Sequence, residues 1–196
     1  MTINPAYVLS PLCACLLLAG CETTSFQAAP VAADICDRAL VGTWDSIGDK
    51  REENGEVELR IDDQCNLLFI EHEKDGTRQG TPTPLHVGHD RGDGYLWVDG
   101  AWVASRFDMK RTVPAGDIFL ISYRIKNDRL TLHAPNDKAI AHRIIDGKIN
   151  GEVRRIDGDL DNRILAPADP AMLHQPWFFD LEKAELRRRA SGPTHD

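Results

Sequence analysis

The chain lacks a long apolar run. Its most hydrophobic stretch, residues 12–20, carries no charge, but it is shorter than the roughly 20 apolar residues that a membrane-spanning helix needs. The chain also lacks the composition of a disordered or fibrous protein, since 42% of its 196 residues are hydrophobic and 28% are charged. These values predict one folded domain of ordinary size with terminal extensions.

Basic residues are in the minority. The chain has 23 Lys and Arg against 31 Asp and Glu, which gives a formal net charge of -8, and residues 1–20 contribute none of it. An acidic domain is repelled by phosphate backbones, so we expect no nucleic-acid partner. The basic run at residues 187–189 is too short to reverse this expectation.

Motifs of catalysis are also missing. No phosphate-binding loop, nucleophile elbow or Cys-x-x-Cys pair occurs in the chain. His86 and His89 are three residues apart and would need a bend at Gly88 to converge with His72 on a metal. We therefore predict no catalytic residue, no metal and no cofactor, although a hydrolytic site assembled from distant residues is left open.

The N-terminal segment has the features of an export signal. Residues 12–20 form a short apolar stretch, as in the h-region of a signal peptide. The sequence Leu18-Ala19-Gly20-Cys21 that follows resembles the lipobox of bacterial lipoproteins. That resemblance implies cleavage before Cys21 and a lipid-anchored protein, and Glu22 after the cysteine favours the periplasmic face of the outer membrane. A basic n-region is absent, so an unlipidated signal peptide and an uncleaved anchor are the alternatives.

Cleavage before Cys21 predicts a role for each of the five cysteines. Cys13 and Cys15 leave with the signal peptide and Cys21 carries the lipid, so Cys36 and Cys65 remain as a pair in an oxidising compartment. We predict a disulfide between them. The chain then divides into a signal peptide (1–20), a flexible Thr-, Ser-, Ala- and Pro-rich tether (21–34), a β domain (35–166) and a C-terminal helical extension with a tail (167–196).

Short apolar alternations separated by turn residues predict a mainly β fold, an antiparallel meander of roughly eight to ten strands. In residues 57–61, apolar residues face the core and Glu58 and Arg60 face water. Hairpins are predicted for residues 117–126 with 129–133, and for 138–145 with 148–156. In the C-terminal extension, one helix is predicted to start at Asp169-Pro170 and a second to cover residues 179–190.

The first strand of the domain contains Gly42-Thr43-Trp44, preceded by a short segment at residues 35–39. This Gly-x-Trp start resembles that of lipocalin-like barrels, in which the Trp plugs one end of the barrel. The resemblance covers about ten residues. It implies a lipocalin-like barrel around an apolar ligand, and a two-layer sandwich is the alternative.

The segment around Asp99-Gly100 is the most aromatic in the chain. With those two residues as a hairpin turn, Trp97 lies opposite Trp102, and both lie on one face beside Tyr95. Both faces of such a hairpin are apolar, so one packs on the core and the second needs a cover. Trp44, Tyr95, Trp97 and Trp102 are therefore the candidate residues for binding a ligand or a partner.

Two leading functional hypotheses follow. The first is a non-enzymatic envelope lipoprotein that binds a small apolar ligand in a cavity near Trp44. The second is an assembly factor, inhibitor or scaffold that binds an envelope protein through an exposed face formed by Tyr95, Trp97 and Trp102. The hydrolase with a spatially assembled site is the third.

Overall fold

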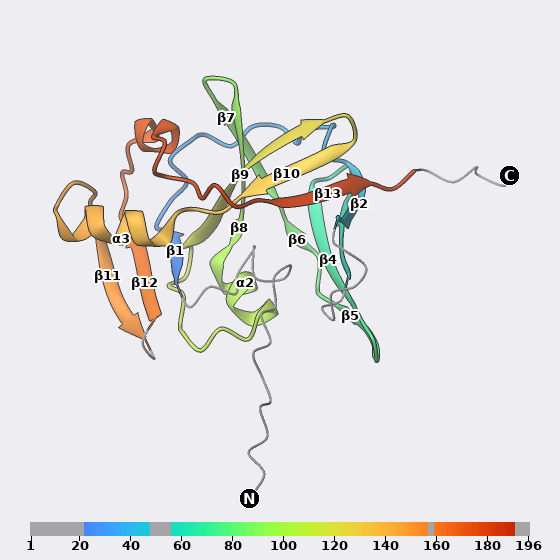
Figure 1. Cartoon of the computed structure of the whole chain (residues 1–196), viewed down its shortest axis with the longest axis horizontal. Coiled ribbons are helices and arrows are strands. Elements are labelled where there is room, and N and C mark those ends of the chain that lie inside the picture. Colours follow the sequence, from blue (N-terminus) through green and yellow to red (C-terminus); the bar gives the residue numbers. More distant parts are fainter. Residues whose placement is uncertain (1–21, 48–55, 157–158, 191–196) are drawn as a thin grey trace, which may run out of the picture.

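The computed structural model describes residues 22–47, 56–156 and 159–190. Cys21, the predicted signal peptide and residues 191–196 lie outside this part of the chain. The described residues form 13 strands, two α-helices and one 3-10 helix, so the predicted mainly β class is confirmed (Figure 1). The strands are β1 (Thr23–Phe26), β2 (Gly42–Ser46), β3 (Glu56–Ile61), β4 (Asn66–Glu73), β5 (Gly76–Gln79), β6 (Thr83–Pro84), β7 (His86–Asp90), β8 (Asp93–Asp99), β9 (Ile118–Lys126), β10 (Arg129–His133), β11 (Gly151–Ile156), β12 (Asp159–Ile164) and β13 (Ala184–Arg188). The helices are α2 (Gly100–Arg106), α3 (Asp137–Ile145) and the 3-10 helix η1 (Pro170–His174).

The strands belong to one hydrogen-bonded sheet that is not closed into a barrel. Its main path runs β11-β12-β1-β9-β10-β13-β2-β3-β4-β5, while β8 branches from β9 and carries β7, and β6 pairs with β4. The path ends at β11 and at β5. The arrangement is consistent with the sandwich-like architecture rather than with a closed barrel.

Strands β8 and β9 lie at the centre and are covered on both faces. Because side chains alternate along a strand, Leu96 faces a first core formed with β2, β3 and β4, while Tyr95 and Trp97 face a second core. The second core adds Phe26 of β1 and Ile140 of α3. Both faces of strand β8 are thus covered, although Trp102, expected on the same face as Tyr95 and Trp97, packs against the first core instead.

Strand β3 pairs with β4 in antiparallel register. One of the two predicted hairpins is confirmed. Strands β9 and β10 form a hairpin whose turn residues Asn127 and Asp128 have φ of 51° and 56°, as a type I′ turn requires. Glu58 of β3 differs from the prediction, because its side chain is buried rather than exposed to water.

The predicted hairpin of residues 138–145 with 148–156 is wrong. Residues 137–145 form α3, which begins where the Asn136 side chain accepts a hydrogen bond from the backbone N–H of Ala139. Ile140 and Ile144 lie one turn apart and are both buried. Strand β11 pairs instead with β12.

The C-terminal extension contains one of its two predicted helices. Asp169 caps η1 by accepting a hydrogen bond from the Ala171 N–H. The second predicted helix, over 179–190, is wrong. This segment contains strand β13, which lies between β10 and β2 in the sheet. Leu186 is buried there at 2% exposure, whereas Leu181 is 94% exposed.

Residues 22–34 differ from the predicted flexible tether. Strand β1 pairs in parallel with β12, and Phe26 is fully buried in the second core. Farther along, the Asp34 N–H donates to the Val87 carbonyl at 2.7 Å. The folded domain therefore begins at least twelve residues before the predicted boundary at residue 35.

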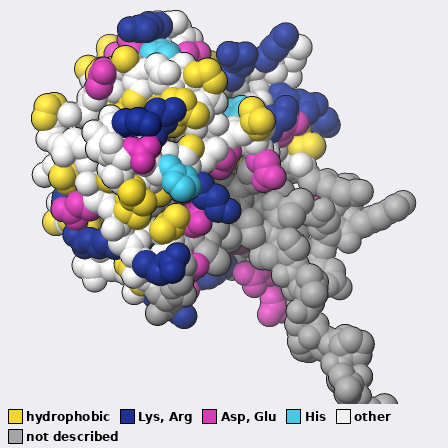
Figure 2. Space-filling view, turned by 60° about the vertical axis from the view of Figure 1, so that its left-hand side comes forward, with side chains coloured by type: hydrophobic (Ala, Val, Ile, Leu, Met, Phe, Trp, Pro, Cys, Tyr) yellow, Lys and Arg dark blue, Asp and Glu magenta, His cyan; other side chains and the backbone are white. Residues whose placement is uncertain are grey.

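The predicted disulfide between Cys36 and Cys65 is present, with the two Cα atoms 5.6 Å apart. It ties the segment before β2 to the turn between β3 and β4. Neither α-helix of the described chain is long and apolar enough to cross a membrane. In the face shown in Figure 2, acidic, basic and apolar side chains are interspersed.

Candidate functional site

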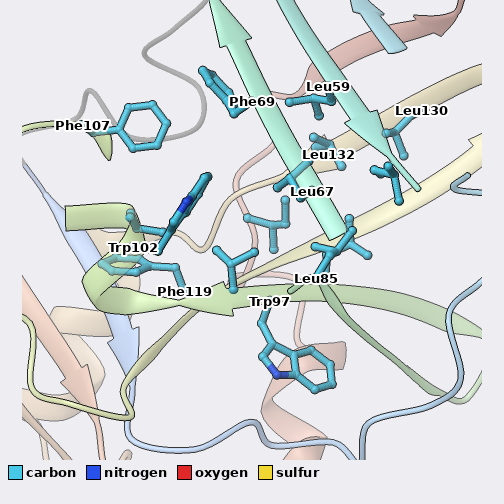
Figure 3. A pocket seen from close by; sticks show the side chains of 15 residues that line it. Leu59, Leu67, Phe69, Leu85, Trp97, Trp102, Phe107, Phe119, Leu130 and Leu132 are labelled. Carbon is cyan, nitrogen blue, oxygen red and sulfur yellow. The ribbon is translucent and has the colours of Figure 1, made fainter. Parts of the chain in front are cut away.

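An apolar cavity lies in the first core. Its volume is about 90 Å³. Every lining residue is hydrophobic: Leu59, Ile61, Leu67, Phe69, Leu85, Leu96, Trp97, Val98, Trp102, Val103, Phe107, Phe119, Ile121, Leu130 and Leu132. They come from strands β3, β4, β8, β9 and β10, from the α2 region, and, in the case of Leu85, from the link between β6 and β7 (Figure 3). The cavity offers dispersion contacts and no polar side chain.

Helix α2 covers one side of this cavity. It begins at Asp99, whose side chain accepts a hydrogen bond from the Trp102 N–H at 2.9 Å. Gly100 packs so closely that a Cβ there would lie 2.7 Å from the Asp117 carbonyl oxygen. This close approach holds Trp102 and Val103 against the cavity.

The predicted hairpin turn at Asp99-Gly100 is therefore wrong, because these residues start a helix instead of reversing a strand. Strand β8 pairs with β7 and β9, so Trp97 lies opposite His86 and Leu120 rather than Trp102.

The indole of Trp102 is anchored at the cavity. Its Nε1–H donates a hydrogen bond to the Thr81 carbonyl at 2.9 Å, which leaves the apolar ring to line the cavity. Trp102 and Phe107 are only partly buried. They form a half-open rim through which an apolar group can reach the interior.

A buried cation lies behind this rim. The Arg106 guanidinium is 4.9 Å from the centre of the Phe69 ring and 5.5 Å from that of Phe107. Its Nη2 donates to Glu71 Oε2 at 2.7 Å, while its Nε has no hydrogen-bond partner among the described residues. The ion pair with Glu71 offsets part of the cost of burying this charge, and the guanidinium contacts both rings.

The four predicted binding residues are not brought together. Trp97 and Trp102 both line the cavity, although most of the Trp97 ring points away from it in Figure 3 and packs in the second core. Trp44 and Tyr95 do not line it. Tyr95 is 1% exposed and Trp97 6%, so no exposed aromatic face exists at β8.

Trp44 has a structural environment instead of a ligand-binding one. Its side chain is fully buried, and its Nε1–H donates to the Leu40 carbonyl at 2.7 Å. The Arg188 guanidinium lies 4.2 Å from the centre of its ring and donates to the carbonyls of Ala39 and Val41. Trp44 therefore joins the segment before β2 to the last strand of the sheet.

Tyr95 is held in a dry and acidic environment. Burial of its hydroxyl, together with the nearby carboxylates of Asp93 and Asp90, raises the pKa of Tyr95 to about 12. Its ring stacks on Phe179 with centroids 6.1 Å apart. The phenol is therefore neutral throughout the physiological range.

The histidines do not converge. His86 stacks on Trp97, His89 contacts Asp34 and Tyr123, and His72 contacts Glu58. Within the described ranges, no three His, Cys, Asp or Glu side chains gather in a way that would hold a metal ion.

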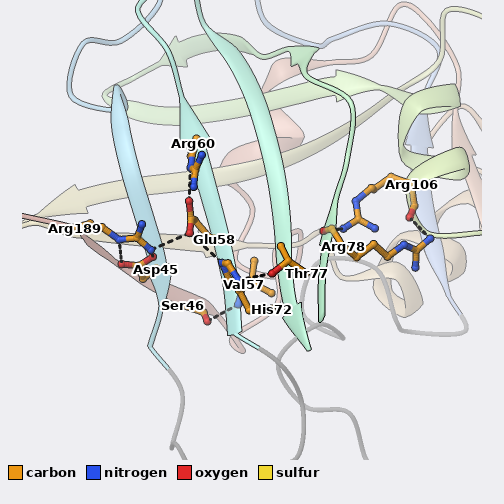
Figure 4. Close-up of polar contacts among 10 residues, drawn as sticks. All are labelled: Asp45, Ser46, Val57, Glu58, Arg60, His72, Thr77, Arg78, Arg106 and Arg189. Atoms are coloured by element: carbon orange, nitrogen blue, oxygen red, sulfur yellow. Dashed lines mark hydrogen bonds and ion pairs between the residues drawn. The ribbon is translucent and has the colours of Figure 1, made fainter. Parts of the chain in front are cut away.

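A polar network occupies the outer face of β3, away from the cavity (Figure 4). Glu58 is 2% exposed and pairs with Arg60, with Arg189 at 2.9 Å and with His72 at 3.0 Å. Burial raises the pKa of this carboxyl, but the hydrogen bonds from His72, Arg60 and Arg189 outweigh it and hold the pKa at about 2. Glu58 is thus a permanent anion at neutral pH.

Within this network a hydroxyl, an imidazole and a carboxylate form a hydrogen-bonded row. Thr77 Oγ1 lies 3.3 Å from His72 Nδ1, and the other ring nitrogen of His72 contacts Glu58. Thr77 and His72 are directly paired across β4 and β5, and Thr77 is exposed. None of the three residues lines the cavity of the first core. Cross-strand pairing accounts for their proximity, so the hydrolase hypothesis gains no support.

Most of the cavity residues were missed by sequence reasoning. Phe69, Phe107 and Phe119 lie on three separate segments, and only the fold brings them together. The available signal was the apolar character of both faces of residues 95–103, which indicated two buried surfaces.

No family model, no curated protein and no solved structure matches this chain.

Proposed function

We propose that this protein is a non-enzymatic binding protein of the cell envelope that takes a small apolar ligand into the cavity of the first core. The single observation that carries the proposal is a cavity whose fifteen lining residues are all hydrophobic. Empty space in a core costs stability, so a void of this kind is a feature that a ligand can fill favourably.

The volume limits the ligand. A dry apolar cavity of about 150 Å³ accommodates benzene, and the cavity here measures about 90 Å³. It therefore takes a group smaller than a benzene ring, such as the end of an alkyl chain. The remainder of a longer ligand would lie at the rim formed by Trp102 and Phe107.

The exposed-aromatic-face hypothesis is not retained, because Tyr95 and Trp97 are buried. The lipocalin-like barrel is not retained, because the sheet is open. The likeness is limited to the Gly42-Thr43-Trp44 start of β2 and its buried Trp44. Within this proposal the ligand lies among Leu59, Phe69 and their neighbours rather than at Trp44.

Export and lipidation form the second part of the proposal. The lipobox-like residues 18–21 support acylation of Cys21. The disulfide between Cys36 and Cys65 is of the kind that forms in an oxidising compartment. Since β1 begins at Thr23, the lipid would sit two residues from the sheet, and the domain would be held close to the outer membrane.

The ligand proposal is tested by titrating the purified domain with 1-hexanol while recording methyl NMR spectra. We expect saturable shifts at Leu59, Leu85 and Leu132, which line the cavity. The variant Val103→Phe fills the space and should weaken binding at least tenfold.

The control for this test is Val153→Phe, on β11 and outside the cavity, which should bind as the wild type does. If the two variants have equal melting temperatures, weaker binding by Val103→Phe results from the filled cavity and not from unfolding. Unchanged binding in folded Val103→Phe protein, or shifts spread over both cores, would reject the proposal.

Lipidation is tested separately by metabolic labelling with an alkyne fatty acid. Incorporation should disappear in Cys21→Ser and persist in Cys13→Ser, because only Cys21 becomes the mature N-terminus. Labelling that survives Cys21→Ser would show that the anchor is wrong and would leave the cavity argument untouched.

A further inference from the structure

A second and larger cavity lies on the other side of the molecule. It measures about 330 Å³ and is bounded by the end of α3, the turn into β11, the end of β12, and η1. Its apolar floor includes Ile164 and Met172, which belong to the second core. Its walls carry Arg143, Lys148 and Trp177. This volume falls within the range of sites for small organic molecules.

The frame of this groove is fixed by backbone hydrogen bonds. At the end of α3, the Gly147 N–H donates to the Ile144 carbonyl and the Lys148 N–H to the Arg143 carbonyl, with Gly147 at φ 69°. This is a Schellman motif, which ends the helix and satisfies its last carbonyls. The Leu165 N–H donates to the Asn150 carbonyl at 2.9 Å, so the opposite wall is joined to the same turn.

Arg143 is the distinctive residue of the groove. Its guanidinium lies over the indole of Trp177, with Cζ 3.9 Å from the ring centre. It forms no ion pair with any residue that the structure describes. Stacking occupies the face of a guanidinium and leaves the N–H donors in its plane available, and that fork matches a carboxylate.

The other charged side chains of the groove already have partners in the fold. Lys148 Nζ pairs with Asp146 Oδ2 at 3.0 Å. Asp169 Oδ1 accepts the hydrogen bond that caps η1. Arg143 therefore supplies the one cation of the lining that lacks an anionic partner among the described residues, and it stands beside an apolar floor.

We propose that this groove binds a small organic carboxylate, with the carboxylate on Arg143 and an apolar ring or short chain on the floor formed by Ile164 and Met172. The site is separate from the cavity of the first core and does not depend on the function proposed above. A carboxylate supplies the missing anion, and the floor selects an apolar body over a small inorganic ion.

The probe is benzoate, compared with the uncharged benzamide, by NMR titration that follows the Trp177 indole N–H. We expect benzoate to bind saturably at millimolar concentration or below and benzamide at least fivefold more weakly. Acetate should also bind more weakly, because it lacks the ring. Equal binding of benzoate and benzamide, or no benzoate binding, would overturn the proposal.

Two variants locate the bound probe. Arg143→Gln should weaken benzoate binding at least fivefold and bring it to the level of benzamide. Its matched control is Arg155→Gln, which removes the same charge from the exposed face of β11 and should change little. Ala171→Trp should block the groove sterically. Benzoate binding that is unchanged in folded Arg143→Gln or Ala171→Trp protein would place the ligand elsewhere and refute the assignment.

Discussion

The polar network around Glu58 gives a quantitative prediction for stability in acid. Glu58 is enclosed by Arg60, His72 and Arg189, and its pKa is held at about 2 in the folded chain, against an ordinary value of 4.5 (Figure 4). Because the folded pKa is lowered, ionisation of this carboxyl stabilises the fold above pH 4.5. That contribution is lost as the pH falls from 4.5 towards 2.

The magnitude follows from the shift. One pKa unit corresponds to about 1.4 kcal/mol, so a displacement of this size sets an upper limit of roughly 3 kcal/mol. Glu58 is buried, but the Arg60 and Arg189 side chains are 51% and 49% exposed, so solvent screens part of the interaction. We therefore expect Glu58→Gln to lower the free energy of unfolding at pH 7 by about 1 to 3 kcal/mol.

The assay is urea unfolding of wild type and variant at several pH values between 7 and 2. The two curves should converge as the pH approaches 2, because the wild-type carboxyl is then protonated as well. Glu56→Gln is the matched control, since Glu56 is an exposed residue of the same strand. An equal loss in both variants, or a difference for Glu58→Gln that does not depend on pH, would refute the reasoning.

Three further predictions concern stability. Replacing Cys36 and Cys65 by Ser should cost about 3 to 4 kcal/mol, because the disulfide closes a loop of sequence separation 29; denaturant unfolding with and without reductant checks this. Burial raises the pKa of Asp137 to about 7, against a weaker opposing hydrogen bond from Thr24, so wild-type stability should fall as the pH rises from about 4 to 7. The contribution of Asp137 is the part of this dependence that Asp137→Asn should remove, so the stability of wild type relative to the variant should fall over this range and the variant should be the more stable protein at pH 8. A parallel pH dependence in both proteins would contradict it. Gly88→Ala should lower the melting temperature by several degrees, since its Cβ would lie 2.6 Å from the Ala32 carbonyl oxygen, while Gly76→Ala, in open space, should not.

Local patterns predicted the parts of the fold that local chemistry decides. The alternation of residues 57–61 gave β3, and Asn127-Asp128 gave the turn between β9 and β10 because both residues tolerate positive φ. The disulfide followed from the pairing of the two cysteines that remain after Cys21. These features do not depend on distant segments.

Two errors came from sequence that suits more than one structure. Asp-Gly is favourable as a hairpin turn, but Asp is also a good helix N-cap, and at Asp99 the second role prevails because Gly100 must pack against Asp117. In residues 137–145 the spacing of Ile140 and Ile144 was a readable helical signal. The Asp146-Gly147 pair, taken as a hairpin turn, ends that helix instead.

The error at residues 179–190 had a tertiary cause. Glu, Lys, Ala, Leu and Arg favour a helix in isolation. Here β10 and β2 both offer unpaired edges, and a strand between them satisfies the backbone hydrogen bonds of all three. Backbone pairing across the sheet thus overrides the intrinsic preference of the segment.

The candidate sites were predictable only in part. The apolar segment 95–103 pointed to buried surfaces, and two of its aromatic residues line the first cavity. The position of Arg143 beside Trp177 had no local signal, since 34 positions separate them and only the packing of α3 near η1 brings them together.

The place of β13 in the sheet has a consequence for how the protein matures. Leu186 pairs with Ser46 on one side and with Leu130 on the other, so the two halves of the sheet are joined by the last of the described strands to emerge during synthesis (Figure 1). Until β13 docks, β2 and β10 each present an unpaired edge, which is a template for pairing with other chains. The exposure of the newly made chain to aggregation and proteolysis therefore ends only when this strand is in place.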